Sequence, residues 1–227
     1  MKRYKYVLLD LDNTLYDTRR TERLAMKELI EIYAGERNEP ELYGLYRKIN
    51  AQKWKALEMG SVKITEINNQ RFADFFAAAE ICGDHKNAAQ DYIDLLAKHH
   101  LYLPGAEDIY QYLTERYEVV LITNGLKEAQ EKRIRGSFID CEISPLFAGE
   151  DMGIHKPDPE VIRIIEREMN WDKNGEQIII GDSLRSDISC AMRAKIDSIW
   201  CNFVAEEPGD YMPCYTVSSL SEIKEIL

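Results

Sequence analysis

The feature that most constrains the fold is a set of short apolar runs that end abruptly in polar residues. They read YKYVLL at residues 4–9, YEVVLIT at 117–123, EQIIIGD at 176–182 and DSIWCNF at 197–203. Runs that are apolar along most of their length are typical of strands buried on both faces of a parallel sheet. We therefore expect these four segments to be buried strands of one mostly parallel sheet.

Between Thr18 and His100 the apolar residues recur instead at spacings of three and four, with breaks at glycines and a proline. This spacing is typical of amphipathic helices. It predicts a four-helix unit with helices over 19–34, 41–60, 64–83 and 85–100.

From residue 101 onward, helical and strand-like patterns alternate. The pattern predicts helices over 107–116, 125–136, 159–170 and 184–194, a short strand over 141–145, and a terminal segment over 215–227. Such alternation with short connections indicates a doubly wound, mostly parallel α/β sheet. We expect an α/β core of residues 1–16 and 101–227, interrupted by a helical-bundle cap of residues 17–100.

Composition narrows the class of partner. Of the 227 residues, 45% are hydrophobic and 30% are charged, which is enough apolar material for a packed core. The formal net charge of −11 argues against binding to a nucleic-acid polymer. No apolar run is long enough to span a membrane, and two acids interrupt the first run, so we expect a cytoplasmic protein. The five widely spaced cysteines are expected to be free thiols.

Polar residues follow three of the expected strands where each strand ends. Asp10 closes the first run, Thr123 and Asn124 close the second, and Asp182 closes the third. Ligands of open parallel sheets bind beyond the carboxyl ends of the strands. Lys156, in the segment GIHKPDP, falls between the last two runs and adds one cation to this edge.

Clustered carboxylates repel one another unless one is protonated or a cation lies among them. Oxygen ligands without histidine or cysteine suit Mg²⁺, which would offset the charge of Asp10 and Asp182. Lys156 could then attract an anionic substrate. Of the two aspartates in DLD, one could attack phosphorus and the other could transfer protons, and we assign these roles to Asp10 and Asp12.

Each feature alone has a structural alternative. The DLD segment could be a capping turn, Thr123 and Asn124 could be turn residues, and Lys156 could be a solvated surface lysine. Asp182 and Asp187 could cap a helix and favour its dipole. Their joint placement at strand ends favours the functional interpretation.

The motifs, in this order, resemble those of the haloacid dehalogenase superfamily of phosphohydrolases with a helical cap of the first type. The first motif matches DLDNT at 10–14, the second the threonine of LITNG, the third the lysine of KPDP, and the fourth GDSLRSD at 181–187. The resemblance implies that Asp10 is the nucleophile and Asp12 the general acid/base. It further implies that Lys156 pairs with Asp10 and holds the phosphoryl group together with Thr123.

The same resemblance implies a Mg²⁺ site made by Asp10, the backbone carbonyl of Asp12 and Asp182. Asp187 would support the metal through a water molecule or from outside the set of direct ligands. An acid at position 12 distinguishes the chain from the dehalogenating branch. Thr123, Asn124 and Lys156 are the phosphate-binding candidates.

Several segments are similar to nucleotidases that act on pyrimidine or noncanonical nucleoside monophosphates. The chain departs from that group at Cys201, which separates Trp200 from Asn202, and at Phe203, which stands where the group has proline. The expected substrate is a small phosphorylated metabolite, and the similarity to these nucleotidases favours a nucleoside 5′-monophosphate. The alternatives are a phosphoglycolate or sugar-phosphate phosphatase, a phosphomutase, and a non-catalytic binding module.

Overall fold

The four apolar runs form the centre of one parallel sheet in the computed structural model, which describes residues 4–58, 61–99, 101–172 and 176–227. The sheet has six strands in the order β3-β2-β1-β4-β5-β6. Their bounds are Tyr6–Asp10 (β1), Glu118–Thr123 (β2), Leu146–Ala148 (β3), Gln177–Gly181 (β4), Asp197–Cys201 (β5) and Tyr215–Val217 (β6). Leu8 of β1 pairs with Val120 on one side and with Ile179 on the other, so β1 is central.

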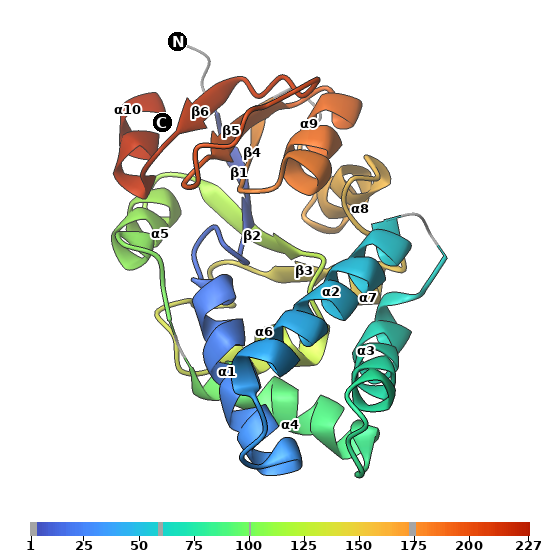
Figure 1. Ribbon diagram of the computed structural model, residues 1–227. Helices are drawn as coiled ribbons and strands as arrows, with labels where there is room; N and C mark the ends of the chain where they lie inside the picture. Colours follow the sequence, from blue (N-terminus) through green and yellow to red (C-terminus); the bar gives the residue numbers. More distant parts are fainter. Residues whose placement is uncertain (1–3, 59–60, 100, 173–175) are drawn as a thin grey trace. The chain divides into compact units, whose positions relative to one another are not determined.

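Helices cover both faces of this sheet (Figure 1). The bounds are Ala106–Thr114 (α5), Gly149–Met152 (α7), Glu160–Glu168 (α8), Ser189–Ala194 (α9) and Ile223–Ile226 (α10). α8 and α9 lie on one side, where their apolar residues pack against alternate residues of the strands, among them Tyr6 and Leu8 of β1. α5 and α10 lie on the other side. The predicted doubly wound, parallel α/β core is confirmed.

Two local predictions in this core were wrong. Residues 141–145 form a turn, and the short strand begins one residue later at Leu146. The segment 184–194 is not one α-helix, because Leu184–Ile188 is a π-helical turn that precedes α9. Glu142 N donates to Asp140 Oδ1 and Ser144 N to Asp140 O, and these local bonds hold 141–144 in a turn. π-helical turns are frequent at functional sites.

The helical segment forms the four predicted helices, α1 (Thr18–Ala34), α2 (Glu39–Glu58), α3 (Ile64–Ala78) and α4 (His85–Lys98). The end predicted for the third helix at Gly83 was wrong, because the helix ends at Ala78. α1 and α3 each pack against both α2 and α4. Their shared core is rich in aromatic side chains, including Tyr46, Phe72, Phe75 and Tyr92. The ends predicted at Met59, Gly60 and His100 lie outside the described residues.

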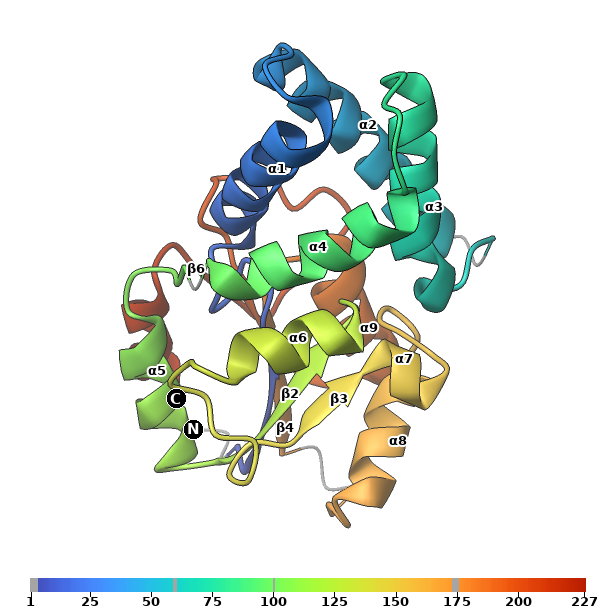
Figure 2. The ribbon, with the colours of Figure 1, turned by 90° about the horizontal axis from the view of Figure 1, so that it is seen from below.

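The chain divides into two units, and one helix lies in a different unit from the one expected. Thr18–Leu101 and Glu128–Gly136 form the helical unit, and the remaining residues form the α/β unit. The alternating pattern predicts residues 128–136 in the core, but α6 (Lys127–Ile134; Figure 2) groups with α4. The physical reason is polar pairing: Lys132 contacts Asp94 at 2.7 Å, and Gln90 donates to Glu128 at 2.8 Å.

Among the described helices, none combines the length and apolarity that crossing a membrane requires. The five cysteines carry free thiols.

Candidate active site

Three neighbouring strands end in the polar residues singled out from the sequence. Asp10 is the last residue of β1, Thr123 is the last residue of β2, and Asp182 directly follows β4. β1 lies between β2 and β4, so these residues share one edge of the sheet. The position follows from the parallel strand order, which aligns the carboxyl ends of the strands.

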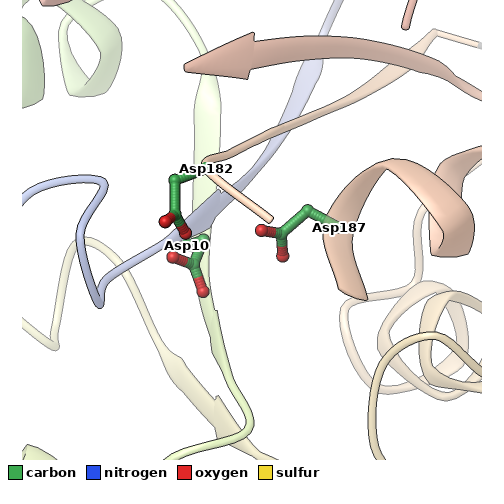
Figure 3. Close-up of side chains that lie close together, drawn as sticks. All are labelled: Asp10, Asp182 and Asp187. Carbon is green, nitrogen blue, oxygen red and sulfur yellow. The ribbon is translucent and has the colours of Figure 1, made fainter. Parts of the chain in front are cut away.

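A cluster of three carboxylates lies at this edge (Figure 3). Asp10, Asp182 and Asp187 each offer a carboxylate oxygen, and these oxygens lie within 4.8 Å of one another. Asp10 and Asp187 are buried, with 6% and 1% exposure, while Asp182 is partly open. Buried like charges at this separation are unfavourable without a compensating cation.

Lys156 supplies one such cation. Its Nζ donates to Oδ1 of Asp10 and to Oδ1 of Asp187, each at 2.7 Å, and to the carbonyl of Ile122 at 3.2 Å. The side chain is 2% exposed, so the alternative of a solvated surface lysine is wrong. The two carboxylates raise the pKa of Lys156 although burial acts to lower it, and the ammonium therefore stays charged.

The electrostatics of Asp10 reflect its burial. Burial raises the pKa of Asp10 to about 7, Lys156 acts in the opposite direction, and the nearby charges of Asp187 and Asp12 raise it further. The hydroxyl of Thr14 donates to Oδ2 of Asp10 at 2.9 Å. The two oxygens of Asp10 therefore face different donors, an ammonium and a hydroxyl, which fix the orientation of the carboxylate.

Asp187 is held over the sheet by the π-helical turn. Its Oδ2 accepts the backbone N–H of Ser183 at 3.0 Å, while its Oδ1 accepts from Lys156. Ser183 caps the turn by accepting from Ser186 N. Asp182 precedes this turn, and the indole Nε1 of Trp200 donates to the backbone carbonyl of Asp182 at 2.9 Å.

The remaining candidates lie on adjoining segments. Thr123 accepts the N–H of Gly125 at its hydroxyl oxygen, at 2.9 Å. Asp12 lies two residues beyond β1, in a turn where Asn13 N donates to Tyr16 O, and its side chain is not one of the three in the carboxylate cluster. The side-chain amide of Asn124 contacts the backbone of Lys156 on both sides, at 2.9 and 2.7 Å.

Four residues of this site were not singled out for a role here by the sequence analysis: Thr14, Gly181, Ser186 and Trp200. Thr14 and Gly181 fall within the quoted motifs, so their place in DLDNT and GDSLRSD was an available signal. Ser186 also falls within GDSLRSD, and Trp200 lies in a segment similar to the nucleotidases, but neither position reveals its partner, because their contacts join segments that are distant in sequence.

The donor set fits a hard divalent cation. It consists of carboxylate oxygens only, and when all three acids are ionised, one ammonium leaves two of their negative charges unbalanced. Mg²⁺ prefers such oxygen ligands and takes few of them from the protein. The geometry is therefore suited to a metal-assisted reaction on an anionic group.

Comparison with known proteins decides the family. The family model described as haloacid dehalogenase-like hydrolase matches residues 4–195. The chain belongs to this family. The resemblance drawn from the four motifs is thereby confirmed.

Relatives of this haloacid dehalogenase-like hydrolase match over nearly their full length. The HAD-hydrolase YfnB of Bacillus subtilis is 30% identical, with 100% of this chain and 97% of the relative covered. The pyrimidine 5′-nucleotidase PynA of Streptococcus pneumoniae is also 30% identical, over 99% and 95% of the two chains. The N-acylneuraminate-9-phosphatase of Mus musculus is 25% identical, over 100% and 95%.

A solved structure supports the assignment. The crystal structure of YfnB bound to magnesium superposes on this hydrolase with a TM-score of 0.90 at 29% identity, covering 100% of this chain and 99% of that one.

Proposed function

We propose that this hydrolase is a Mg²⁺-dependent phosphomonoesterase that acts through an aspartyl-phosphate intermediate. The observation that carries the proposal is the buried ammonium of Lys156, which lies 2.7 Å from Asp10 at the end of the central strand. An ammonium beside a carboxylate nucleophile can hold a phosphoryl oxygen and offset the charge that develops in transfer.

The reaction divides into two transfers at phosphorus. In the first, an oxygen of Asp10 bonds to phosphorus while the bond to the leaving alcohol breaks, and Asp12 gives its proton to the departing oxygen. In the second, Asp12 takes a proton from water, whose oxygen bonds to phosphorus as the bond to Asp10 breaks. Inorganic phosphate leaves and both aspartates return to their starting states.

The metal would be held by Asp10, Asp182 and the backbone carbonyl of Asp12, with Asp187 acting through water. When bound, Mg²⁺ would neutralise carboxylate charge and stabilise the negative charge on the phosphoryl oxygens. Thr123 and Lys156 make up the phosphate-binding side of the site, and Asn124 lies beside Lys156.

The substrate we propose is a nucleoside 5′-monophosphate with a pyrimidine or noncanonical base. The support is the full-length similarity to the pyrimidine 5′-nucleotidase PynA. A sugar phosphate is the second candidate, and it is favoured by the full-length similarity to N-acylneuraminate-9-phosphatase. A cytoplasmic location stays a prediction. A non-catalytic role is disfavoured, because all the residues that the reaction needs are present.

The test is a phosphate-release assay on the purified chain with Mg²⁺ and with EDTA. The panel compares uridine, thymidine and purine monophosphates with N-acylneuraminate 9-phosphate, phosphoglycolate and hexose phosphates. We expect the highest kcat/KM on a pyrimidine monophosphate, no turnover in EDTA, and none in Asp10→Asn. A sugar phosphate that exceeds every nucleotide would replace the nucleotidase assignment with the second candidate.

The intermediate can be tested separately. Borohydride reduces an acyl phosphate, so a quenched reaction should convert Asp10 to homoserine, which peptide mass spectrometry detects. Turnover without this product would overturn the role of Asp10 as nucleophile.

A further inference from the structure

The backbone of Lys156 lies outside the helices and strands that fix the rest of the site. α7 ends at Met152 and α8 begins at Glu160, so Lys156 lies in the connection between them. Its position therefore depends on contacts from elsewhere in the fold. The amide side chain of Asn124 makes two of them, accepting the Lys156 N–H at Oδ1 at 2.9 Å and donating from Nδ2 to the Lys156 carbonyl at 2.7 Å.

Through these two bonds the Asn124 side chain pairs with the backbone N–H and C=O of Lys156, as the backbone of a neighbouring strand would. A primary amide carries the same donor and acceptor pair as a peptide group. Asn124 directly follows the last residue of β2, so its side chain continues the hydrogen bonding of that strand onto Lys156. Nδ2 also lies 3.2 Å from Ser186 Oγ, in the turn that holds Asp187.

We propose that Asn124 is a positioning residue that acts through Lys156 and not by binding phosphate with its side-chain amide. The amide oxygen and both amide hydrogens already have protein partners. The inference rests on the proposed function only in that Lys156 acts on the phosphoryl group. It replaces the phosphate-binding role expected for this side chain.

The reaction depends on how precisely the backbone of Lys156 is held. The ammonium of Lys156 bonds simultaneously to Asp10, Asp187 and the carbonyl of Ile122, so a small movement of its backbone breaks at least one of these contacts. A displacement of about 1 Å in a catalytic group can cost about 100-fold in rate. Loss of the Asn124 amide should therefore lower kcat more than it raises KM.

The chain contains a matched control for this arrangement. Asn202, which follows β5, makes the same pair of bonds to the backbone of Glu206, at 2.9 and 2.8 Å. Glu206 is exposed. Asn202→Leu therefore removes an equivalent pair of bonds without touching Lys156.

The experiment uses p-nitrophenyl phosphate with Mg²⁺ and the full chain. The variants are Asn124→Leu, which keeps the size of the side chain, Asn202→Leu, Lys156→Gln, and the double variant of Asn124 and Lys156. We expect Asn124→Leu to lower kcat by about 10- to 100-fold with KM within about threefold, and Asn202→Leu to leave both unchanged. In the Lys156→Gln background, the Asn124 substitution should lower kcat by less than about a further twofold, because the effects of residues that act as one unit are not additive.

An equal effect of Asn124→Leu with and without Lys156 would show that Asn124 acts directly, and would overturn the inference. So would unchanged kcat. A crystal structure of the Mg²⁺-loaded variant gives a readout that needs no activity: the distance from Lys156 Nζ to Asp10 Oδ1 should lengthen. If the wild-type chain hydrolyses no phosphomonoester, the proposed function fails, and this distance alone decides whether Asn124 positions Lys156.

Discussion

The carboxylate of Asp187 occupies the space in which a side chain on residue 181 would begin. A Cβ atom placed on Gly181 would lie 2.3 Å from both Cγ and Oδ2 of Asp187. Gly181 ends β4, and Asp187 reaches back over it from the π-helical turn. The glycine is therefore what allows Asp187 to reach Lys156 and the other carboxylates.

Gly181→Ala should displace Asp187. We expect a loss of about 1–3 kcal/mol in the free energy of unfolding, as for overpacked sites, together with weaker Mg²⁺ activation. Urea unfolding and a Mg²⁺ titration of phosphatase activity measure the two effects. Gly44→Ala in α2 is the control: nothing lies within 4 Å of its added Cβ, so it should stabilise the protein by up to about 1 kcal/mol. An alanine at 181 with normal Mg²⁺ activation would contradict the prediction.

Thr14→Val should impair the reaction while preserving the shape of the side chain. The hydroxyl that donates to Asp10 Oδ2 is fully buried, and a hydrogen bond to a charged group contributes about 1.5–3 kcal/mol. We expect kcat/KM to fall by about 10-fold or more, since about 1.4 kcal/mol corresponds to 10-fold in rate. Thr14→Ser keeps the hydroxyl and should retain most of the activity; if serine and valine behave alike, the hydrogen bond does not matter.

Asp10→Asn should stabilise the metal-free protein at high pH. Because the pKa of Asp10 is raised to about 7 from an unfolded value near 4, its ionisation costs folding free energy as the pH rises between these values. The penalty is complete above about pH 7 and absent below about pH 4. Asparagine mimics the neutral acid and avoids this cost.

Thermal unfolding in EDTA measures the effect. The variant should melt several degrees above the wild type at pH 8, since about 1 kcal/mol shifts Tm by roughly 2–4 °C in a chain of this size. The difference should shrink steadily toward pH 4. Asp210→Asn, which alters an exposed carboxylate, should change Tm at neither pH. A variant that is less stable than the wild type at pH 8 would show that the ion pair with Lys156 outweighs the burial of Asp10.

Arg71→Ala should destabilise the helical unit. The guanidinium is buried, donates to Asn50 Oδ1 at 2.9 Å and to Asn68 Oδ1 at 2.6 Å, and lies 4.5 Å from the ring centroid of Tyr92. Its loss leaves the amide oxygens of the buried Asn68 and the half-buried Asn50 without these donors. We expect a cost of about 3 kcal/mol in urea unfolding, whereas alanine at the exposed Arg47 should cost less than about 0.5 kcal/mol. Equal effects at the two positions would contradict this account.

The sequence was sufficient to predict the strands and where they end. A strand buried on both faces needs apolar residues throughout, so it ends where polar residues begin. Asp10, Thr123 and Asp182 were placed at the correct edge for this reason. The sequence was insufficient for α6, since its partners Asp94 and Gln90 lie more than thirty residues earlier and no local pattern marks them. The prediction of a strand at 141–145 was wrong because the hydrogen bonds to Asp140 hold this short segment in a turn.

Alone, the sequence determined the residue types of the site and the strand ends that carry them, because hydrophobic periodicity and motif order are local properties. Only the tertiary structure decided how these residues contact one another. It placed Lys156 between Asp10 and Asp187, put the amide of Asn124 on the backbone of Lys156, and required glycine at 181. Each of these relations depends on distances of a few ångströms between segments far apart in the chain, which close packing fixes and local sequence does not encode.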